Sequence, residues 1–136
     1  MIRQELEIDG WWSVTVFYLP VDDDMPEVIE TLREAGCPRH DIRQVLDLFP
    51  HKLNKGVTWP GYRQRHSVTV IGRSSSWEQF FDTLLHEINH LVDIITDYYR
   101  VTNHGEPPAY LQGEIGRQMA SAVKFIACPC CGMQKD

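Results

Sequence analysis

The stretch SWEQFFDTLLHEINHLVDII, residues 76–95, decides the expected fold, because it carries the clearest helical pattern in the chain. Ser76 with Gln79 three residues later is a capping-box pattern, and Ser75 with Glu78 offers an alternative register. Apolar residues then recur at helical spacing and are expected to fill one face. These positions are Trp77, Phe80, Phe81, Leu84, Leu85, Ile88, Leu91, Val92 and Ile95. The stretch predicts a long amphipathic helix that packs on a core.

The opposite face of this helix carries the two histidines of the motif His86-Glu87-Ile88-Asn89-His90. Two histidines four residues apart project from successive turns, so both imidazoles can reach one metal ion. Glu87 is placed to take a proton from a water that zinc activates. The motif therefore predicts a zinc site with His86 and His90 as ligands and Glu87 as general base. The alternative interpretation is a solvated polar face on which two histidines coincide by chance.

A catalytic zinc needs a third protein ligand, and the sequence after the helix offers His104, Glu106 and Glu114. A tight antiparallel helix hairpin that turns near Thr102 favours Glu114. If the first helix ends soon after Asp93 and the chain loops back, Glu106 is favoured instead. The spacing alone leaves this choice open.

Further polar groups lie close to the motif in sequence. Asp93 and Asp97 fall on the histidine face, where either carboxylate can accept the second ring N–H of a histidine ligand or remain an ordinary solvent-facing charge. Peptide hydrolysis also needs an oxyanion donor. We prefer Tyr110 for this role, although the default role of each candidate is structural. The candidates are Tyr110, His104, Tyr98 and Tyr99.

The rest of the chain predicts strands and shorter helices around this long helix, which makes an α+β fold. The strands are expected at Trp11–Leu19, Val57–Trp59 and His66–Gly72, the last two as a hairpin, and the helices at Pro26–Ala35 and Asp41–Phe49. A turn near Val101–Gly105 leads to a final helix that runs to about Ile126. We expect one domain over residues 1–136, with an N-terminal part (1–53), a catalytic core (54–126) and a Cys-rich tail (127–136).

Composition excludes several function classes. The net charge is −6 and there is no basic stripe, so nucleic acid is not an expected partner. No apolar run is long enough to cross a membrane, and the start of the chain lacks the apolar segment of an export signal. We therefore expect a soluble protein in a reducing cytoplasm, because the four cysteines do not form a disulfide framework.

The cysteines near the C-terminus have their own possible chemistry. Cys128 and Cys131 have the CxxC spacing of a zinc knuckle, with Cys130 between them and Cys37 as a lone candidate for a further ligand. The alternatives are redox or intermolecular thiol chemistry, or a tail whose thiols have no decisive role.

Residues Asn54 to Leu111 resemble small peptidase-like proteins carried by phages and mobile elements of gut bacteria. They are similar, more distantly, to ImmA/IrrE-type and other minimal gluzincins, which pair HExxH with a glutamate in an ExxA-type motif on a following helix. The resemblance is carried by Asn54-Lys55-Gly56, Ser67–Gly72, Phe80–Glu87 and Glu106–Leu111. Two departures from the pattern are the short spacing between HExxH and Glu106 and the two prolines after Glu106.

The resemblance implies a minimal zincin-like domain, in which a small sheet packs on the HExxH helix and a following helix bears a ligand. It implies zinc bound by His86, His90 and Glu106, with Glu87 as general base. It also implies that the strand before the active helix, His66–Gly72, binds an extended substrate by β-augmentation, although this strand can simply be a sheet edge.

Three classes of function follow. The first is a zinc-dependent peptide-bond hydrolase acting on a peptide or protein substrate. The second is a non-catalytic metal-binding regulatory or interaction protein of a phage or mobile element. The third, a purely structural component, predicts that no metal is bound.

Overall fold

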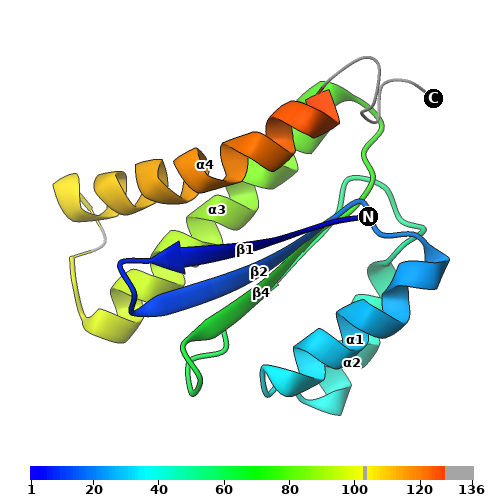
Figure 1. The fold of residues 1–136 in the computed structure, drawn as a ribbon, viewed down its shortest axis with the longest axis horizontal. Coiled ribbons are helices and arrows are strands. Elements are labelled where there is room, and N and C mark those ends of the chain that lie inside the picture. The colour runs from blue at the N-terminus through cyan, green and yellow to red at the C-terminus, as the bar shows by residue number, and fades with distance from the viewer. Residues whose placement is uncertain (103, 128–136) are drawn as a thin grey trace.

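The computed structural model of the chain has a four-stranded mixed sheet between two pairs of helices (Figure 1). It describes residues 1–102 and 104–127. The strands are β1 (Ile2–Ile8), β2 (Trp12–Tyr18), β3 (Gly56–Trp59) and β4 (His66–Ile71). The helices are α1 (Met25–Glu34), α2 (Arg39–Leu48), α3 (Trp77–Tyr99) and α4 (Glu106–Ala127), and the 3-10 turn η1 (Asp22–Asp24) precedes α1. The predicted α+β fold is confirmed.

The strand order in the sheet is β1-β2-β4-β3. β2 and β4 are parallel, whereas β1 pairs with β2 and β3 pairs with β4 in antiparallel fashion. The predicted hairpin of β3 and β4 is therefore confirmed. The prediction that His66–Gly72 is a sheet edge open to a substrate strand is wrong, because β4 lies between β2 and β3. β3 is the edge strand on that side of the sheet, and it packs against α3.

Each face of the sheet is covered by one pair of helices, which divides the core into two clusters. Trp12, Val14 and Val16 of β2 pack on the side of α3 and α4. Phe17 of β2 packs on the other side, together with α1, α2 and Val68 of β4. β2 is therefore buried on both faces, and the removal of this apolar surface from water is the main force that holds the layers together.

β1 is an element that the sequence analysis did not predict. Its residues alternate, with Leu6 and Ile8 in the core, and the following Asp9-Gly10 turn leads into β2. Asp9 has φ of 53° and Gly10 has φ of 71°, a left-handed backbone that suits Asp and Gly in hairpin turns. This alternation followed by an Asp-Gly turn is the signal that identifies β1.

The four predicted helices are confirmed, with ends that differ by a few residues. Ser76 caps α3, because its hydroxyl accepts a hydrogen bond of 3.1 Å from the backbone N–H of Gln79. The prediction that nine apolar positions of α3 fill the core face is wrong for Phe81 and Leu85, which are 44% and 43% exposed. The apolar arc of α3 is wider than the surface that the sheet and α4 cover, so its margin remains in solvent.

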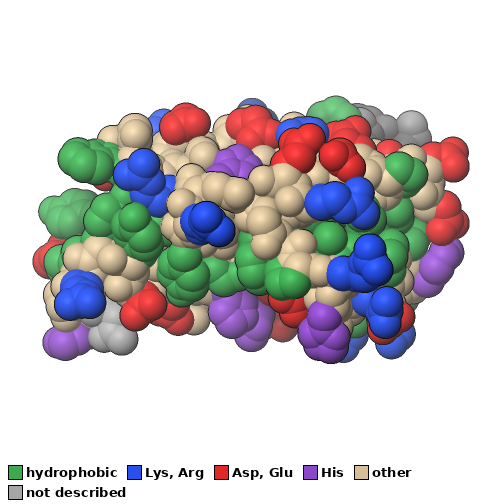
Figure 2. All heavy atoms as spheres, turned by 90° about the horizontal axis from the view of Figure 1, so that it is seen from below, with side chains coloured by type: hydrophobic (Ala, Val, Ile, Leu, Met, Phe, Trp, Pro, Cys, Tyr) green, Lys and Arg blue, Asp and Glu red, His purple; other side chains and the backbone are tan. Residues whose placement is uncertain are grey.

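The outer surface carries mixed charges. On the face that Figure 2 shows, Lys and Arg side chains are interspersed with acidic and apolar side chains. None of the helices in residues 1–102 and 104–127 is long and apolar enough to cross a membrane.

The neighbouring residues Phe80 and Phe81 test this packing directly. Phe80 is completely buried, so Phe80→Ala is expected to lower the free energy of unfolding by about 3–5 kcal/mol. Phe81→Ala removes a side chain that is largely in water and is expected to cost less than about 1 kcal/mol. Urea denaturation of both variants measures the difference, and equal losses would show that the face of α3 is assigned wrongly.

Candidate metal centre

The HExxH motif lies in the middle of α3, where the helix is flanked by more than two turns on each side. His86 and His90 are both exposed, and their Nε2 atoms lie 3.0 Å apart. The two rings are nearly perpendicular, at an interplanar angle of 86°. The helical spacing thus brings one nitrogen of each imidazole to a common point outside the helix, as the sequence predicts.

This spacing fits a zinc ion. Zn–N bonds of about 2.0–2.1 Å in a tetrahedral arrangement place two ligand nitrogens about 3.3 Å apart. The observed separation of the Nε2 atoms of His86 and His90 requires only a small adjustment of the rings to reach this value. Imidazole nitrogen is also among the ligand types that zinc prefers. The donor pair is therefore suited to zinc in both geometry and chemistry.

Glu87 differs from the two histidines in its environment, because it is only 2% exposed. Its side chain lies on the side of α3 that faces β3, where Thr58 Oγ1 donates a hydrogen bond of 2.8 Å to Glu87 Oε1. Thr58 in turn lies 2.9 Å from Thr69 Oγ1, its cross-strand partner on β4. The edge of the sheet thus holds one oxygen of the carboxylate in a fixed position.

The close approach of β3 to Glu87 depends on Gly56, the first residue of the strand. A Cβ atom at Gly56 would lie 2.8 Å from Thr83 Cγ2 and 2.9 Å from Glu87 Oε2. Because such distances are shorter than ordinary van der Waals contacts, any larger residue at this position forces Glu87 or the strand to move. Gly56, Thr58 and Thr69 are parts of the site that the sequence analysis missed. The pairing of Thr58 with Thr69 in the predicted hairpin is the signal that points to them.

The protonation of Glu87 reflects two opposing influences. Burial raises the pKa of this carboxyl above its ordinary value, because an apolar environment disfavours the charged form. The hydrogen bond from Thr58 and the neighbouring His90 and His86 act in the opposite direction without cancelling the effect of burial. A general base benefits from such a shift, since its proton affinity moves toward neutral pH.

Among the His, Cys, Asp and Glu residues in the described part of the chain, one group of three brings its ligand atoms within 4.8 Å of one another. It consists of His86, Glu87 and His90. Glu106 begins α4 and is exposed, and it is not part of this group. The helix that carries it packs on α3 and β1, whereas Glu87 faces β3. The assignment of Glu106 as third ligand stays a prediction.

Glu114, the alternative ligand, has partners within its own helix. Its carboxylate accepts hydrogen bonds from Arg117, at 3.0 and 2.7 Å, and from the side chain of Gln118 at 2.7 Å. These donors, Arg117 first, lower the pKa of Glu114 to about 2. Glu114 would have to leave these contacts in order to bind a metal.

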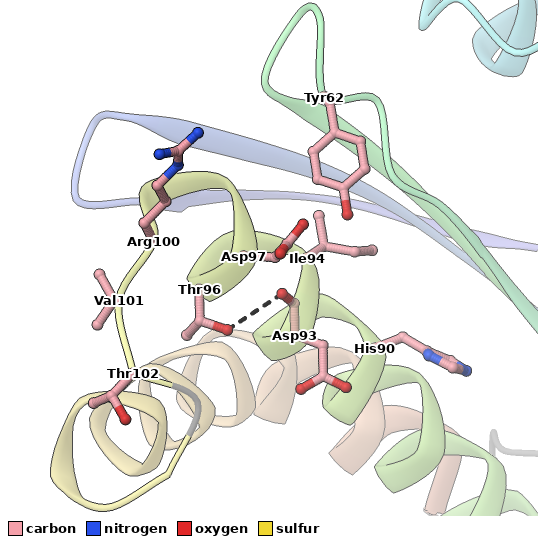
Figure 3. A pocket seen from close by; sticks show the side chains of 9 residues that line it. All are labelled: Tyr62, His90, Asp93, Ile94, Thr96, Asp97, Arg100, Val101 and Thr102. Atoms are coloured by element: carbon pink, nitrogen blue, oxygen red, sulfur yellow. Dashed lines mark hydrogen bonds between the residues drawn. The ribbon is translucent and has the colours of Figure 1, made fainter.

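A cavity of about 600 Å³ is lined by His90 and by the two aspartates of the histidine face, Asp93 and Asp97 (Figure 3). Tyr62, from the turn between β3 and β4, also lines it. Burial, and then the negative charge of Asp97 and a hydrogen bond to it, raise the pKa of Tyr62. The two aspartates therefore border an open space beside the candidate metal site, which leaves them accessible to a ligand.

The candidate oxyanion donors occupy several different environments. Tyr110 is 74% exposed on α4 and stays a prediction for this role. Tyr98 and Tyr99 form an aromatic cluster with Trp12, in which the ring centroids of Tyr98 and Trp12 are 5.1 Å apart. His104 Nδ1 lies 3.1 Å from the hydroxyl of Thr102.

The candidate cysteine site falls mostly outside the described residues, since Cys128, Cys130 and Cys131 all lie there. Cys37 is a buried free thiol, and burial, followed by the charge of Asp41, raises its pKa to about 11. A thiol with this pKa is almost entirely protonated at neutral pH, so in this environment Cys37 is a weak metal ligand.

Comparison of the chain with protein-family models, with curated proteins and with solved structures found no match. The functional argument therefore rests on the arrangement of His86, Glu87 and His90.

The raised pKa of Glu87 predicts how the metal-free protein responds to pH. The folded state binds this proton more tightly than the unfolded chain, so the stability due to Glu87 is largest at low pH and is lost as the pH rises through the raised pKa. Glu87→Gln should remove this loss. We expect its Tm to change less than that of the wild type between about pH 4 and pH 8, measured with a chelator present. Asp82→Asn, on the exposed side of α3, is the control and should retain the wild-type slope. Parallel curves for wild type and Glu87→Gln would contradict the burial of this carboxyl.

Proposed function

We propose that this protein is a zinc-dependent peptide-bond hydrolase, with His86 and His90 as metal ligands and Glu87 as general base. The observation that carries the proposal is a buried carboxylate held by a sheet edge directly beside two convergent imidazoles. A functional role is supported by this burial, because a carboxyl with a single hydrogen bond from Thr58 is costly to remove from water and an apolar side chain is not.

The chemistry follows from the placement of these groups. When bound, zinc supplies a Lewis acid that polarises the scissile carbonyl and makes water more acidic. Glu87 accepts a proton from the attacking water while the water oxygen bonds to the carbonyl carbon. The carboxyl of Glu87 then gives the proton to the amide nitrogen as the C–N bond breaks. Thr58 occupies Oε1, so Oε2 is the oxygen left for this proton.

The free edge of β3 is the proposed place for the substrate backbone. β3 pairs with β4 on one side only, and it lies next to α3. An extended peptide added to this edge gains main-chain hydrogen bonds, and its amide groups pass close to Glu87. In this proposal β3 binds the substrate by β-augmentation, in place of β4, for which the resemblance implied this role.

Other parts of the proposal rest on sequence. Glu106 is proposed as third ligand and Tyr110 as oxyanion donor, both from the resemblance to minimal gluzincins. The same resemblance supports a protein of a phage or mobile element. The buried free thiol of Cys37 supports a reducing compartment such as the cytoplasm.

A second candidate function is a metal-binding regulatory protein without turnover. One observation that favours it is the exposure of His86 and His90. Another is that, in the described residues, the group of His86, Glu87 and His90 contains no further acidic or histidine side chain. Such a site can hold a metal whose coordination a partner completes.

The experiment that separates these candidates measures zinc and turnover together. Purified protein is expected to contain about one zinc per chain at this site, and His86→Ala or His90→Ala should abolish it. Glu87→Gln should keep the zinc and lose hydrolysis of a broad peptide library, by at least about 100-fold, because it removes the base and no ligand. Zinc retained in both histidine variants would exclude the site. Zinc in the wild type without any turnover would favour the regulatory protein.

The third ligand is tested by comparing two glutamate variants. Glu106→Ala is expected to weaken zinc binding by more than the 10–100-fold that is typical for groups that only orient a ligand. Glu114→Ala should have a smaller effect, since its carboxylate is bound to Arg117 and Gln118. Competition with a chelator measures both affinities. If Glu114→Ala loses the metal while Glu106→Ala keeps it, the assignment is reversed.

A further inference from the structure

A polar network lies on the sheet face that α1 and α2 only partly cover. Phe17 of β2 and Val68 of β4 pack on this face against the two helices. Ser13, Thr15 and His66 project from the same face, because side chains along a strand alternate between its two sides. They lie near the start of β2 and β4, at the end of the sheet that extends past α1 and α2 (Figure 1). The network is therefore separate from the candidate metal centre, since α3 packs on the other face.

The imidazole of His66 lies between two hydroxyl groups. Its Nδ1 is 2.6 Å from Ser13 Oγ, and its Nε2 is 2.8 Å from Thr15 Oγ1. Thr15 Oγ1 donates a hydrogen bond of 2.7 Å to Glu5 Oε2 on β1. Ser13 is paired with His66 in the sheet, and Thr15 is paired with Glu5. The register of three neighbouring strands thus fixes the relative positions of all four side chains.

The direction of these hydrogen bonds follows from the single proton of each hydroxyl. Thr15 gives its proton to Glu5, so it can only accept from His66, and Nε2 carries the proton of the neutral ring. Nδ1 is then the acceptor, and the hydroxyl of Ser13 donates to it. The chain of contacts therefore places a base on the Ser13 hydroxyl and holds that base in one tautomer. This is the arrangement that activates a serine nucleophile.

The two ends of the network differ in their accessibility. Thr15 is 1% exposed, and the second oxygen of Glu5, Oε1, accepts a 2.9 Å hydrogen bond from Arg3. The groups that orient His66 are thus held in place by the protein. Ser13 is only partly buried, so a substrate can reach its hydroxyl.

A cavity of about 410 Å³ adjoins this network, and its volume suits a small molecule. Glu5, Thr15 and His66 line it on the side of the sheet, and the C-terminal end of α1 lines it at Glu34. Gln64, in the turn before β4, also lines it. The side-chain amide of Gln64 is a hydrogen-bond donor of the kind that stabilises a developing oxyanion.

We propose that Ser13 is the nucleophile of a second active site, which hydrolyses small carboxylic esters bound in this cavity. His66 Nδ1 takes the proton of Ser13 while Ser13 Oγ bonds to the carbonyl carbon of the ester. The amide of Gln64 donates to the carbonyl oxygen as it becomes negative. The ester C–O bond then breaks, and His66 gives the proton to the oxygen of the leaving alcohol. Thr15 and Glu5 are positioning residues.

The second half of the reaction releases the acyl group from Ser13. A water molecule gives a proton to His66 Nδ1 while its oxygen bonds to the acyl carbon. The bond from this carbon to Ser13 Oγ breaks, and Ser13 takes the proton back from His66. The products are a carboxylic acid and the restored serine.

The test is covalent labelling of the full-length wild type by a fluorophosphonate. The serine oxygen bonds to phosphorus, and fluoride leaves. Mass spectrometry of the digested protein follows each serine separately. Ser13 should be labelled at least about 100-fold faster than Ser121, an exposed serine on α4, because a positioned base typically contributes that much or more. This comparison is made within one protein and does not depend on the folding of a variant.

Variants assign the reactivity of Ser13 to the network. His66→Asn should slow the labelling of Ser13 by at least about 100-fold. His51→Asn is the matched control and should leave the rate unchanged, since this exposed imidazole is paired with Asp22 elsewhere on the surface. Thr15→Val should also slow labelling, whereas Thr15→Ser should restore the rate because it keeps the hydroxyl.

The substrate class is tested with p-nitrophenyl acetate, with a chelator present throughout. Release of p-nitrophenolate is expected from the wild type and should be lost in Ser13→Ala. The chelator removes any zinc, so this result is independent of the proposed metal-dependent hydrolase. Equal labelling of Ser13 and Ser121, an unchanged Ser13 rate in His66→Asn, or full ester turnover in Ser13→Ala would overturn the proposal.

Discussion

The burial of the Glu87 carboxylate between α3 and β3 is the constraint on which the candidate site depends. A charged group in this position loses its hydration, and a single hydrogen bond from Thr58 only partly replaces it. A residue that contributed only to stability would be apolar here, as Ile88 and Leu91 are on the same helix. This cost in free energy is explained if the Glu87 carboxyl must contact a water molecule that the neighbouring imidazoles help to position.

Several features of the fold are explained by this one contact. Gly56 allows β3 to approach α3 without a Cβ atom in the way. The pairing of Thr58 with Thr69 fixes the Thr58 hydroxyl, from which the Glu87 carboxylate accepts a hydrogen bond. β3 sits at the edge of the sheet, which leaves its outer side free for a substrate backbone. The apolar side of α3 anchors the helix on the sheet, so His86 and His90 remain in solvent where a metal can enter.

The parts of this arrangement that depend on local spacing could be predicted from the sequence. The α3 pattern and the paired histidines follow from a period of 3.6 residues, and the Ser76 cap follows from the capping-box pattern of Ser76 and Gln79. The contact of Thr58 with Glu87 joins residues 29 positions apart, and no local pattern determines it. The interior place of β4 depends on the parallel pairing with β2, which likewise joins distant segments. The exposure of Phe81 was missed because hydrophobic periodicity defines an arc of the helix but not how much of it the sheet covers.

The most direct test of the account is a crystal structure of the protein grown with zinc, with anomalous differences recorded at the zinc edge. We predict one strong peak bonded to Nε2 of His86 and Nε2 of His90. Glu87 should remain hydrogen-bonded to Thr58 and lie beyond the bonding distance of about 2.2 Å from the ion, within reach of a water. An absent peak at the histidines, or a Glu87 carboxylate bonded directly to the zinc, would contradict the assignment of Glu87 as the base of a metal centre.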